Sequence, residues 1–275
     1  MTLRQTSKLY EYARTADIWD TPVEFAPALR FLSAATHLLR ALGDLADHEL
    51  WQEPTARLRS CRRVICTVPL PFNSVPLQLA DQAAWLEDWA QRQRPVLQPE
   101  HVRPLGEAVE SLKALSAEGA NPLASAAEDF LTLDGPAGGL MAVPSRKFLS
   151  VISNSLPPTS GIQAGVYSNL QAGNSYTSAA LVGPPSWIPP SLLTAPRAAQ
   201  LAVVHYQFFR TEPSVDPLFD SVFGDAALSM GVHRDIERSR PYTVASTRPA
   251  PQAETVAEHT PSLRTANTMT AVAGG

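Results

Sequence analysis

The stretch Ala179–Phe208, AALVGPPSWIPPSLLTAPRAAQLAVVHYQF, consists of two apolar runs joined by a proline-rich connection. The first run, Ser178–Val182, and the last, Leu201–Phe208, have the near-continuous apolar character of strands buried on both faces. Between them, Gly183-Pro184-Pro185 is typical of a turn, and Pro190–Ala198 is typical of a short helix. This order predicts an α/β fold with a parallel sheet that is covered on both faces.

The residues that precede this stretch extend the α/β unit toward the middle of the chain. Lys147–Ser153, KFLSVIS, predicts a further strand, and Gly161–Leu170 is either a short helix or an irregular crossover. The glycine-rich segment Asp134–Gly139 is the clearest boundary, because it separates helical patterns from strand patterns. We therefore expect a small three-layer α/β unit over residues 140–240.

The N-terminal region, residues 1–134, is predicted to be mainly helical with one strand. Thr21-Pro22-Val23-Glu24 has the cap, proline and glutamate of a helix start, which predicts a helix from there to about Asp47. The β-branched run Arg63–Val68 predicts the strand. Three more helices are predicted near Leu77–Arg92, Leu105–Ala117 and Pro122–Leu131.

Two domain arrangements fit these elements. If the Val64–Val68 strand joins the sheet, the chain is one domain; otherwise two domains meet near Gly135. Beyond about Pro241, the chain is rich in Thr, Ala, Pro and Ser, and no aromatic residue follows Tyr242. This composition predicts a disordered tail over residues 241–275, because it offers little apolar surface to bury.

Composition narrows the classes of function. The 275-residue chain has a formal net charge of −4, so any nucleic-acid site must be a local basic patch on an otherwise acidic protein. Its 2 cysteines, Cys61 and Cys66, have no second Cys or His pair nearby, which argues against a zinc site and a disulfide framework. We expect no metal, no cofactor and a cytoplasmic location.

Several common catalytic motifs are missing from the sequence. It contains no G-x-x-x-x-G-K-[ST] triphosphate loop, no G-x-G-x-x-G after a strand, no G-x-S-x-G and no H-E-x-x-H. A stand-alone NTPase or NAD-dependent enzyme is therefore not expected. The N-terminus has no apolar signal segment, and no run reaches the ~18 apolar residues of a membrane span, so no membrane partner is expected.

Three segments, Phe148–Ser155 (FLSVISNS), Thr177–Pro185 and Leu192–Tyr206, resemble the C-terminal RecA-like domain of helicases and related DNA-handling ATPases. The resemblance covers residues 148–206. It implies a helix with an arginine that reaches the ATP bound by a partner RecA-like domain, and Arg197 occupies that position. The family's glycine–arginine pair and its second arginine are missing here. The resemblance therefore implies a degenerate or incomplete helicase-like module that acts with DNA or with a partner ATPase.

Candidate ligand-binding residues follow from the expected sheet. Ligands of parallel sheets bind beyond the carboxyl ends of the strands. The candidates for a nucleotide or ligand crevice are Ser153, Asn154, Ser155, Gly183, Ser186 and Arg197. The alternative is that Gly183 simply forms a turn and that Arg197 is a solvated or ion-paired helix residue.

The densest basic cluster in the sequence is the candidate for nucleic-acid binding. It comprises Arg57, Arg59, Arg62 and Arg63. Arginines bind phosphates and displace their counterions, although no aromatic residues suited to base stacking interleave with these four. The alternative is a solvated segment that leads into the predicted strand. His205, inside an apolar run, is either a general base or a core histidine with satisfied hydrogen bonds.

Three functions fit these observations. The first is a non-catalytic accessory module with a helicase-like fold, which acts with DNA or a partner ATPase in bacterial genome maintenance or phage defence. The second is a structural or interaction scaffold that binds a protein subunit. The third is a small-molecule transferase or hydrolase that uses the polar residues at the strand ends. We expect the first, because the resemblance and the missing triphosphate loop both favour it.

Overall fold

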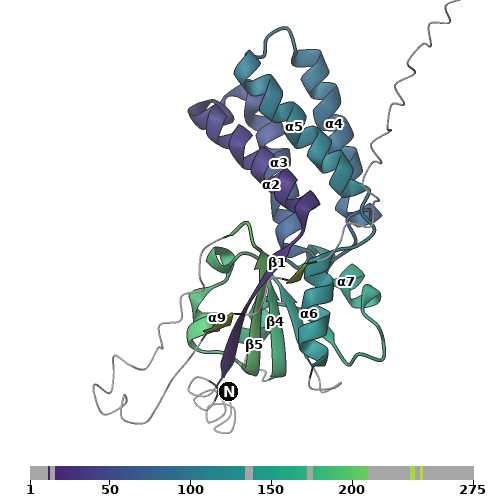
Figure 1. Ribbon diagram of the computed structural model, residues 1–275, viewed down its shortest axis with the longest axis vertical. Helices are drawn as coiled ribbons and strands as arrows, with labels where there is room; N and C mark the ends of the chain where they lie inside the picture. Colours follow the sequence, from purple (N-terminus) through teal and green to yellow (C-terminus); the bar gives the residue numbers. More distant parts are fainter. Residues whose placement is uncertain are drawn as a thin grey trace, which may run out of the picture.

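The fold is that of a computed structural model, in which helices form a bundle on one edge of a parallel sheet (Figure 1). The structure describes Tyr12 and residues 16–133, 139–171 and 176–209, together with two short strands at 236–238 and 242–243. None of the helices in these ranges combines the length and the apolarity needed to cross a membrane.

The principal strands of the sheet lie in the order β3-β2-β4-β5-β1, and each neighbouring pair is parallel. Their bounds are β1 Asp17–Glu24, β2 Leu140–Val143, β3 Gln163–Val166, β4 Tyr176–Val182 and β5 Ala198–Tyr206. Two short strands, β6 (Ile236–Arg238) and β7 (Tyr242–Thr243), pair in parallel with β1. The predicted α/β class with a parallel sheet is confirmed.

Helices cover both faces of the sheet. They are α6 (Pro122–Thr132) and α7 (Leu149–Ser155) on one face, and α8 (Tyr167–Gln171) and α9 (Pro190–Thr194) on the other. Because side chains alternate along a strand, Val204 of β5 joins the core on the α6 side, and its neighbour Val203 joins the core on the α8 side. This double burial explains why β4 and β5 are apolar at nearly every position.

The helical bundle lies between β1 and α6 in the sequence. Its helices are α2 (Ala26–Leu42), α3 (Glu49–Thr67), α4 (Leu79–Gln93) and α5 (Pro99–Ser116). α5 packs against both α2 and α4, and the apolar side chains of the bundle form one continuous core with the α6 face of the sheet. Figure 1 shows β1 leading directly into α2, so the bundle stands on the carboxyl edge of the sheet.

The predicted helix start at Thr21–Glu24 is wrong, because these residues belong to β1. β1 pairs with β5 along nearly its whole length, and a local capping pattern carries no information about such distant pairing. β6 pairs with residues 18–20 and β7 with residues 23–24, so Pro22, which lacks an N–H donor, lies in the gap between them. The helix begins instead at Ala26, with Pro27 in its first turn.

The predicted strand at Arg63–Val68 is also wrong, since α3 continues to Thr67. Its buried residues Leu58, Cys61 and Ile65 recur at helical spacing, and this face packs into the core of the bundle. Tertiary packing therefore outweighs the β propensity of the run. The strand that the N-terminal region contributes to the sheet is β1.

The predicted strand at Lys147–Ser153 is wrong as well. These residues form the 3-10 turn η3 (Arg146–Phe148) and most of α7, and the strand of this region, β2, precedes them. β2 is the short, fully buried run LMAV, which periodicity alone does not distinguish from a buried helical turn. Within Gly161–Leu170, the structure has β3 followed by α8.

The other predicted helices are confirmed. α4, α5, α6 and α9 overlap their predicted ranges, although α5 begins earlier, at Pro99. Asn121 caps α6, because its side-chain oxygen accepts from the Leu123 N–H at 3.0 Å. The predicted tail over residues 241–275 lies outside the described residues, apart from β7 at its start.

Candidate functional site

The carboxyl edge of the sheet is where parallel α/β folds usually open a binding crevice, at the point where the strand order changes direction. Here the direction changes between the neighbouring strands β2 and β4. The crossover helices agree, because α7 lies on one face and α8 and α9 lie on the other. A bound nucleotide or sugar phosphate would therefore be expected beside the ends of β2 and β4.

The protein itself fills this position. Gly183 follows β4 with a φ of +149°, and its N–H donates to the Val204 carbonyl at 2.9 Å. A Cβ on Gly183 would lie 3.0 Å from the Tyr167 hydroxyl and 3.4 Å from Thr67 Cγ2. Because Thr67 ends α3, the last turn of that helix and the ring of Tyr167 occupy the space next to the strand end.

The side chains at this edge are hydrogen-bonded within the fold. The Tyr167 hydroxyl donates to the Val182 carbonyl at 2.9 Å, and burial raises the pKa of this phenol, so it stays a neutral donor. The Thr67 hydroxyl donates to the Arg63 carbonyl at 2.7 Å. The Tyr167 bond joins α8 to β4 at this edge, and both bonds direct the hydroxyl groups toward the backbone.

A second buried network joins the sheet to the bundle through Asn121. Its Nδ2 donates to the carbonyls of Val68 and Leu70, at 2.9 and 2.8 Å, directly after α3. Its Oδ1 accepts from the Leu123 N–H at 3.0 Å and from the Tyr206 hydroxyl at 3.4 Å. One amide therefore links the end of α3, the start of α6 and the end of β5, and all of its hydrogen-bonding capacity is used.

The predicted crevice residues do not come together. Gly183 lies at the carboxyl edge and is buried, while Ser186 is exposed in the 3-10 turn η4 (Pro185–Trp187). Ser153, Asn154 and Ser155 are exposed positions at the end of α7, not polar residues at the end of a strand. The reason for grouping them, a shared strand edge, therefore does not hold.

Arg197 does not lie on a helix. It directly precedes β5, at the amino edge of the sheet, and its carbonyl accepts from the Tyr176 N–H at 2.9 Å. The segment Phe148–Ser155, which the RecA-like resemblance implies is a strand, is mainly α7. The role in contacting ATP that the resemblance implies for Arg197 thus has no support from its position.

His205 is a core histidine with a partner that the sequence did not identify. Its Nε2 lies 2.8 Å from Asp20 Oδ1, and its Nδ1 lies 2.9 Å from the Tyr206 carbonyl. The two side chains are buried and join β5 to β1. A carbonyl oxygen only accepts, so Nδ1 donates to it, and the second bond then needs a proton on Nε2 or on Asp20. Two such contacts favour the core interpretation of His205.

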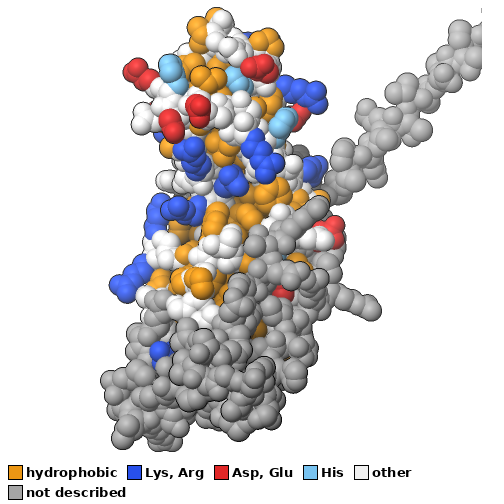
Figure 2. Space-filling view, turned by 90° about the vertical axis from the view of Figure 1, so that its left-hand side faces the viewer, with side chains coloured by type: hydrophobic (Ala, Val, Ile, Leu, Met, Phe, Trp, Pro, Cys, Tyr) orange, Lys and Arg blue, Asp and Glu red, His pale blue; other side chains and the backbone are white. Residues whose placement is uncertain are grey.

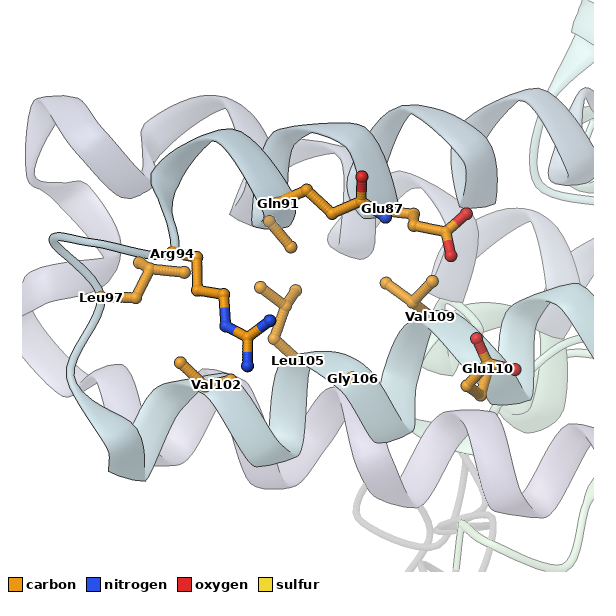
Figure 3. Close-up of a pocket in the computed structure, with 10 residues that line it drawn as sticks. Glu87, Gln91, Arg94, Leu97, Val102, Leu105, Gly106, Val109 and Glu110 are labelled. Carbon is orange, nitrogen blue, oxygen red and sulfur yellow. The ribbon is translucent and has the colours of Figure 1, made fainter.

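A hollow of about 270 Å³ lies between α4 and α5 (Figure 3). Its apolar lining comprises Ala90, Leu97, Val102, Leu105 and Val109. Gly106 adds open space, because no described atom beyond its own helix turn lies within 4 Å of a Cβ built there. Figure 3 shows Arg94 reaching from α4 toward α5 at one end and Glu87 and Glu110 at the other. Lys113 binds both glutamates, at 2.6 and 3.2 Å.

The four arginines predicted to contact nucleic acid lie on α3, not in a segment that leads into a strand. Arg57 belongs to the contact between α3 and α4. Its guanidinium binds Glu53 at 2.7 Å and Gln82 at 2.9 Å, and it lies 4.0 Å from the centre of the Trp85 ring. Arg57 therefore has its own partners and is separate from the other three.

Arg59, Arg62 and Arg63 share one side of α3, because residues three and four apart lie on the same helix face. Arg40 of α2 is near Arg62, because burial, Arg40 and Arg59 together lower the pKa of Arg62. These four residues are the arginine cluster. Figure 2 shows Lys and Arg side chains gathered across the middle of the face that carries α2 and α3, with acidic side chains toward the outer end of the bundle.

Little negative charge opposes the arginine cluster. Arg59 pairs with Asp47 at 3.9 Å, but both side chains are exposed, so the pair contributes little. Cys66 is close to Arg62, but burial raises the pKa of its thiol, so it is uncharged at neutral pH. Across the described part of the chain, no carboxylate forms an ion pair with the other three arginines of the cluster.

No family model matches the chain, and no curated protein or solved structure is significantly similar to it. The function is therefore inferred from the sequence and the geometry. Within residues 16–133, 139–171 and 176–209, no His, Cys, Asp or Glu side chains are grouped so as to hold a metal ion. The arginine cluster is the feature of this geometry that is best suited to a ligand, and its chemistry favours phosphate groups.

Proposed function

We propose that the protein is a non-catalytic accessory module that contacts the phosphate backbone of nucleic acid through the arginine cluster. The observation that carries the proposal is the gathering of Arg40, Arg59, Arg62 and Arg63 on α2 and α3 of a chain whose formal net charge is −4. Such local positive potential attracts nucleic acid even when the whole protein is acidic.

The closed carboxyl edge supports the non-catalytic part of this proposal. Tyr167 and the end of α3 occupy the place where an α/β enzyme would hold a nucleotide. The sequence also lacks the triphosphate loop and the dinucleotide fingerprint. ATP hydrolysis, where the process needs it, would come from a partner ATPase. The setting expected from the sequence, bacterial genome maintenance or phage defence, remains a prediction.

Fluorescence anisotropy with single- and double-stranded DNA tests the proposal. If three phosphates are contacted, affinity should fall about 40-fold between 50 and 200 mM salt. The double variant Arg59→Gln/Arg63→Gln should lose most of the binding. Arg103→Gln is the matched control, because Arg103 is an exposed arginine of α5 paired with Glu107 at 2.8 Å. No binding at 50 mM salt, or an equal loss in the control, would overturn the proposal.

The hollow between α4 and α5 favours a second candidate function, a scaffold that binds a protein subunit. Its apolar lining and the charged residues at its two ends suit an apolar side chain of a partner. The Gly106→Leu variant would fill the hollow without touching the arginine cluster. A protein complex that is lost in this variant, together with absent DNA binding, would favour the scaffold over the proposed function.

A further inference from the structure

We propose that the hollow between α4 and α5 binds a small apolar monocarboxylate, whose carboxylate contacts Arg94 and whose hydrocarbon part packs against the apolar lining. The hollow has a volume of about 270 Å³. Pockets for drug-sized molecules span ~300–1,000 Å³, so this one suits a smaller ligand. The proposal goes beyond the nucleic-acid function, because the hollow belongs to α4, α5 and the connection between them, whereas the arginine cluster lies on α2 and α3.

Apolar surface in the hollow is accessible to water. Ala90 and Leu97 are half-buried, and Val102, near the start of α5, is 37% exposed. The buried residues Leu105 and Val109 complete the apolar lining. A hydrocarbon group that packs against these side chains would remove apolar surface from water, which is favourable. The lining therefore selects a ligand with an apolar body.

Gly106 leaves room for that ligand. It lies within α5, where a glycine costs helix stability relative to alanine. It also lines the hollow, and a Cβ built on it would meet no described atom within 4 Å beyond its own helix turn. The missing side chain therefore adds open space next to the apolar lining, and a large side chain at this position would take that space from a ligand.

The guanidinium of Arg94 selects an anionic group on the ligand. Figure 3 shows its side chain reaching from the end of α4 toward α5, beside Val102 and Leu105. No carboxylate in the described part of the chain forms an ion pair with Arg94, whereas Asp88 binds the neighbouring Arg92 at 2.7 Å. Arginine stays charged, and its planar fork matches the two oxygens of a carboxylate. A ligand carboxylate would therefore supply a partner for Arg94.

The opposite end of the hollow limits the ligand to one carboxylate. Glu87 and Glu110 lie there, and both bind Lys113, at 2.6 and 3.2 Å. Two carboxylates and one ammonium leave a net negative charge, which would repel a second anionic group on the ligand. Because Lys113 already pairs with both glutamates, an ammonium group on a ligand would have to compete with it. The charges thus favour a monocarboxylate over a dicarboxylate or an amine of the same length.

Isothermal titration calorimetry with octanoate, octylammonium and octanedioate, at equal ionic strength, tests the proposal. Octanoate should bind to the full chain and raise its Tm, and the other two should bind at least about 10-fold more weakly. Arg94→Gln should weaken octanoate binding about 10-fold, as expected for the loss of one charge-assisted fork. Arg92→Gln is the matched control, because Arg92 is an exposed arginine of the same helix that does not line the hollow. It should change the Kd by less than about 2-fold.

Gly106→Leu provides a second test that leaves Arg94 in place. Its side chain should fill the hollow and abolish octanoate binding, while DNA binding stays as in the wild type. Equal binding of octanoate and octylammonium, or equal losses in the Arg94 and Arg92 variants, would mean non-specific adsorption of amphiphiles and overturn the proposal. Binding of none of the three probes would also overturn it, as expected if the hollow instead takes an apolar side chain of a partner protein. Neither result bears on the arginine cluster.

Discussion

The carboxyl edge of the sheet and the arginine cluster of the bundle differ in how far their polar groups are paired within the fold. At the edge, Tyr167 and Asn121 donate to backbone carbonyls of neighbouring elements, and this satisfies them. In the cluster, burial lowers the pKa of Arg62, and the nearby guanidinium groups of Arg40 and Arg59 lower it further. Since folds normally pair their buried polar groups, the difference suggests that the edge serves stability and the cluster serves a ligand.

This contrast separates two kinds of substitution. Changes at the sheet and its edge should lower the free energy of unfolding, because they break contacts that the fold itself uses. Changes in the arginine cluster should leave stability unchanged or raise it while they remove binding, as is common where a binding site is not optimised for stability.

The largest expected effect is at the Asp20–His205 pair inside the sheet. Asp20→Ala should lower the free energy of unfolding by about 3–5 kcal/mol, because it leaves the buried histidine without its 2.8 Å partner. Urea denaturation would measure this loss. Asp47→Ala is the control, since that carboxylate is exposed and its effect should stay within about 0.5 kcal/mol. Similar effects of the two substitutions would mean that the buried pair does not stabilise the sheet.

Gly183→Ala tests whether the carboxyl edge is closed. The substitution should cost about 3 kcal/mol, because it combines a strained positive φ with a Cβ placed 3.0 Å from the Tyr167 hydroxyl. Gly106→Ala is the matched control. Its Cβ meets open space within an α-helix, so it should stabilise the protein by up to about 1 kcal/mol. Equal stability of the two variants would argue for an open edge and reinstate the crevice.

Asn121→Ala should have a smaller effect, about 2 kcal/mol, because it leaves the carbonyls of Val68 and Leu70 unpaired. Tyr206→Phe removes only the 3.4 Å bond to the same amide and should cost less than about 1 kcal/mol. Thermal unfolding of both variants would show the order. A larger loss of stability in Tyr206→Phe than in Asn121→Ala would mean that the tyrosine, and not the amide, makes the main connection between sheet and bundle.

Local patterns in the sequence predicted the elements whose structure is decided locally. β4 and β5 are mainly apolar runs bounded by proline and glycine, and α6 begins at Pro122, where its helix was predicted to start. The arginines of α3 were also identified as a basic cluster. Their true arrangement, with Arg57 turned toward Trp85, depends on the helix that the pattern missed.

Distant pairing could not be predicted in the same way. β1 is placed by its register with β5, almost two hundred residues later, and this pairing also brings Asp20 to His205. Arg40 approaches Arg62 only because α2 and α3 are neighbouring helices of the bundle. Arg197 was assigned to a helix and to a crevice at the carboxyl edge, but it directly precedes β5 and therefore lies at the amino edge of the sheet. A single segment assigned to the wrong secondary structure thus changes which residues are expected to form a site.

The smallest expected effect has the opposite sign. Arg62→Met should raise the free energy of unfolding by about 1 kcal/mol, because it removes a buried N–H that lacks an acceptor among the described residues and relieves repulsion from Arg40 and Arg59. Arg63→Met, at an exposed position, should change stability by less than about 0.5 kcal/mol. Urea midpoints without phosphate would measure both. A loss of stability in Arg62→Met would show that Arg62 supports the fold, and the contrast between a closed edge and an open cluster would then fail at its central residue.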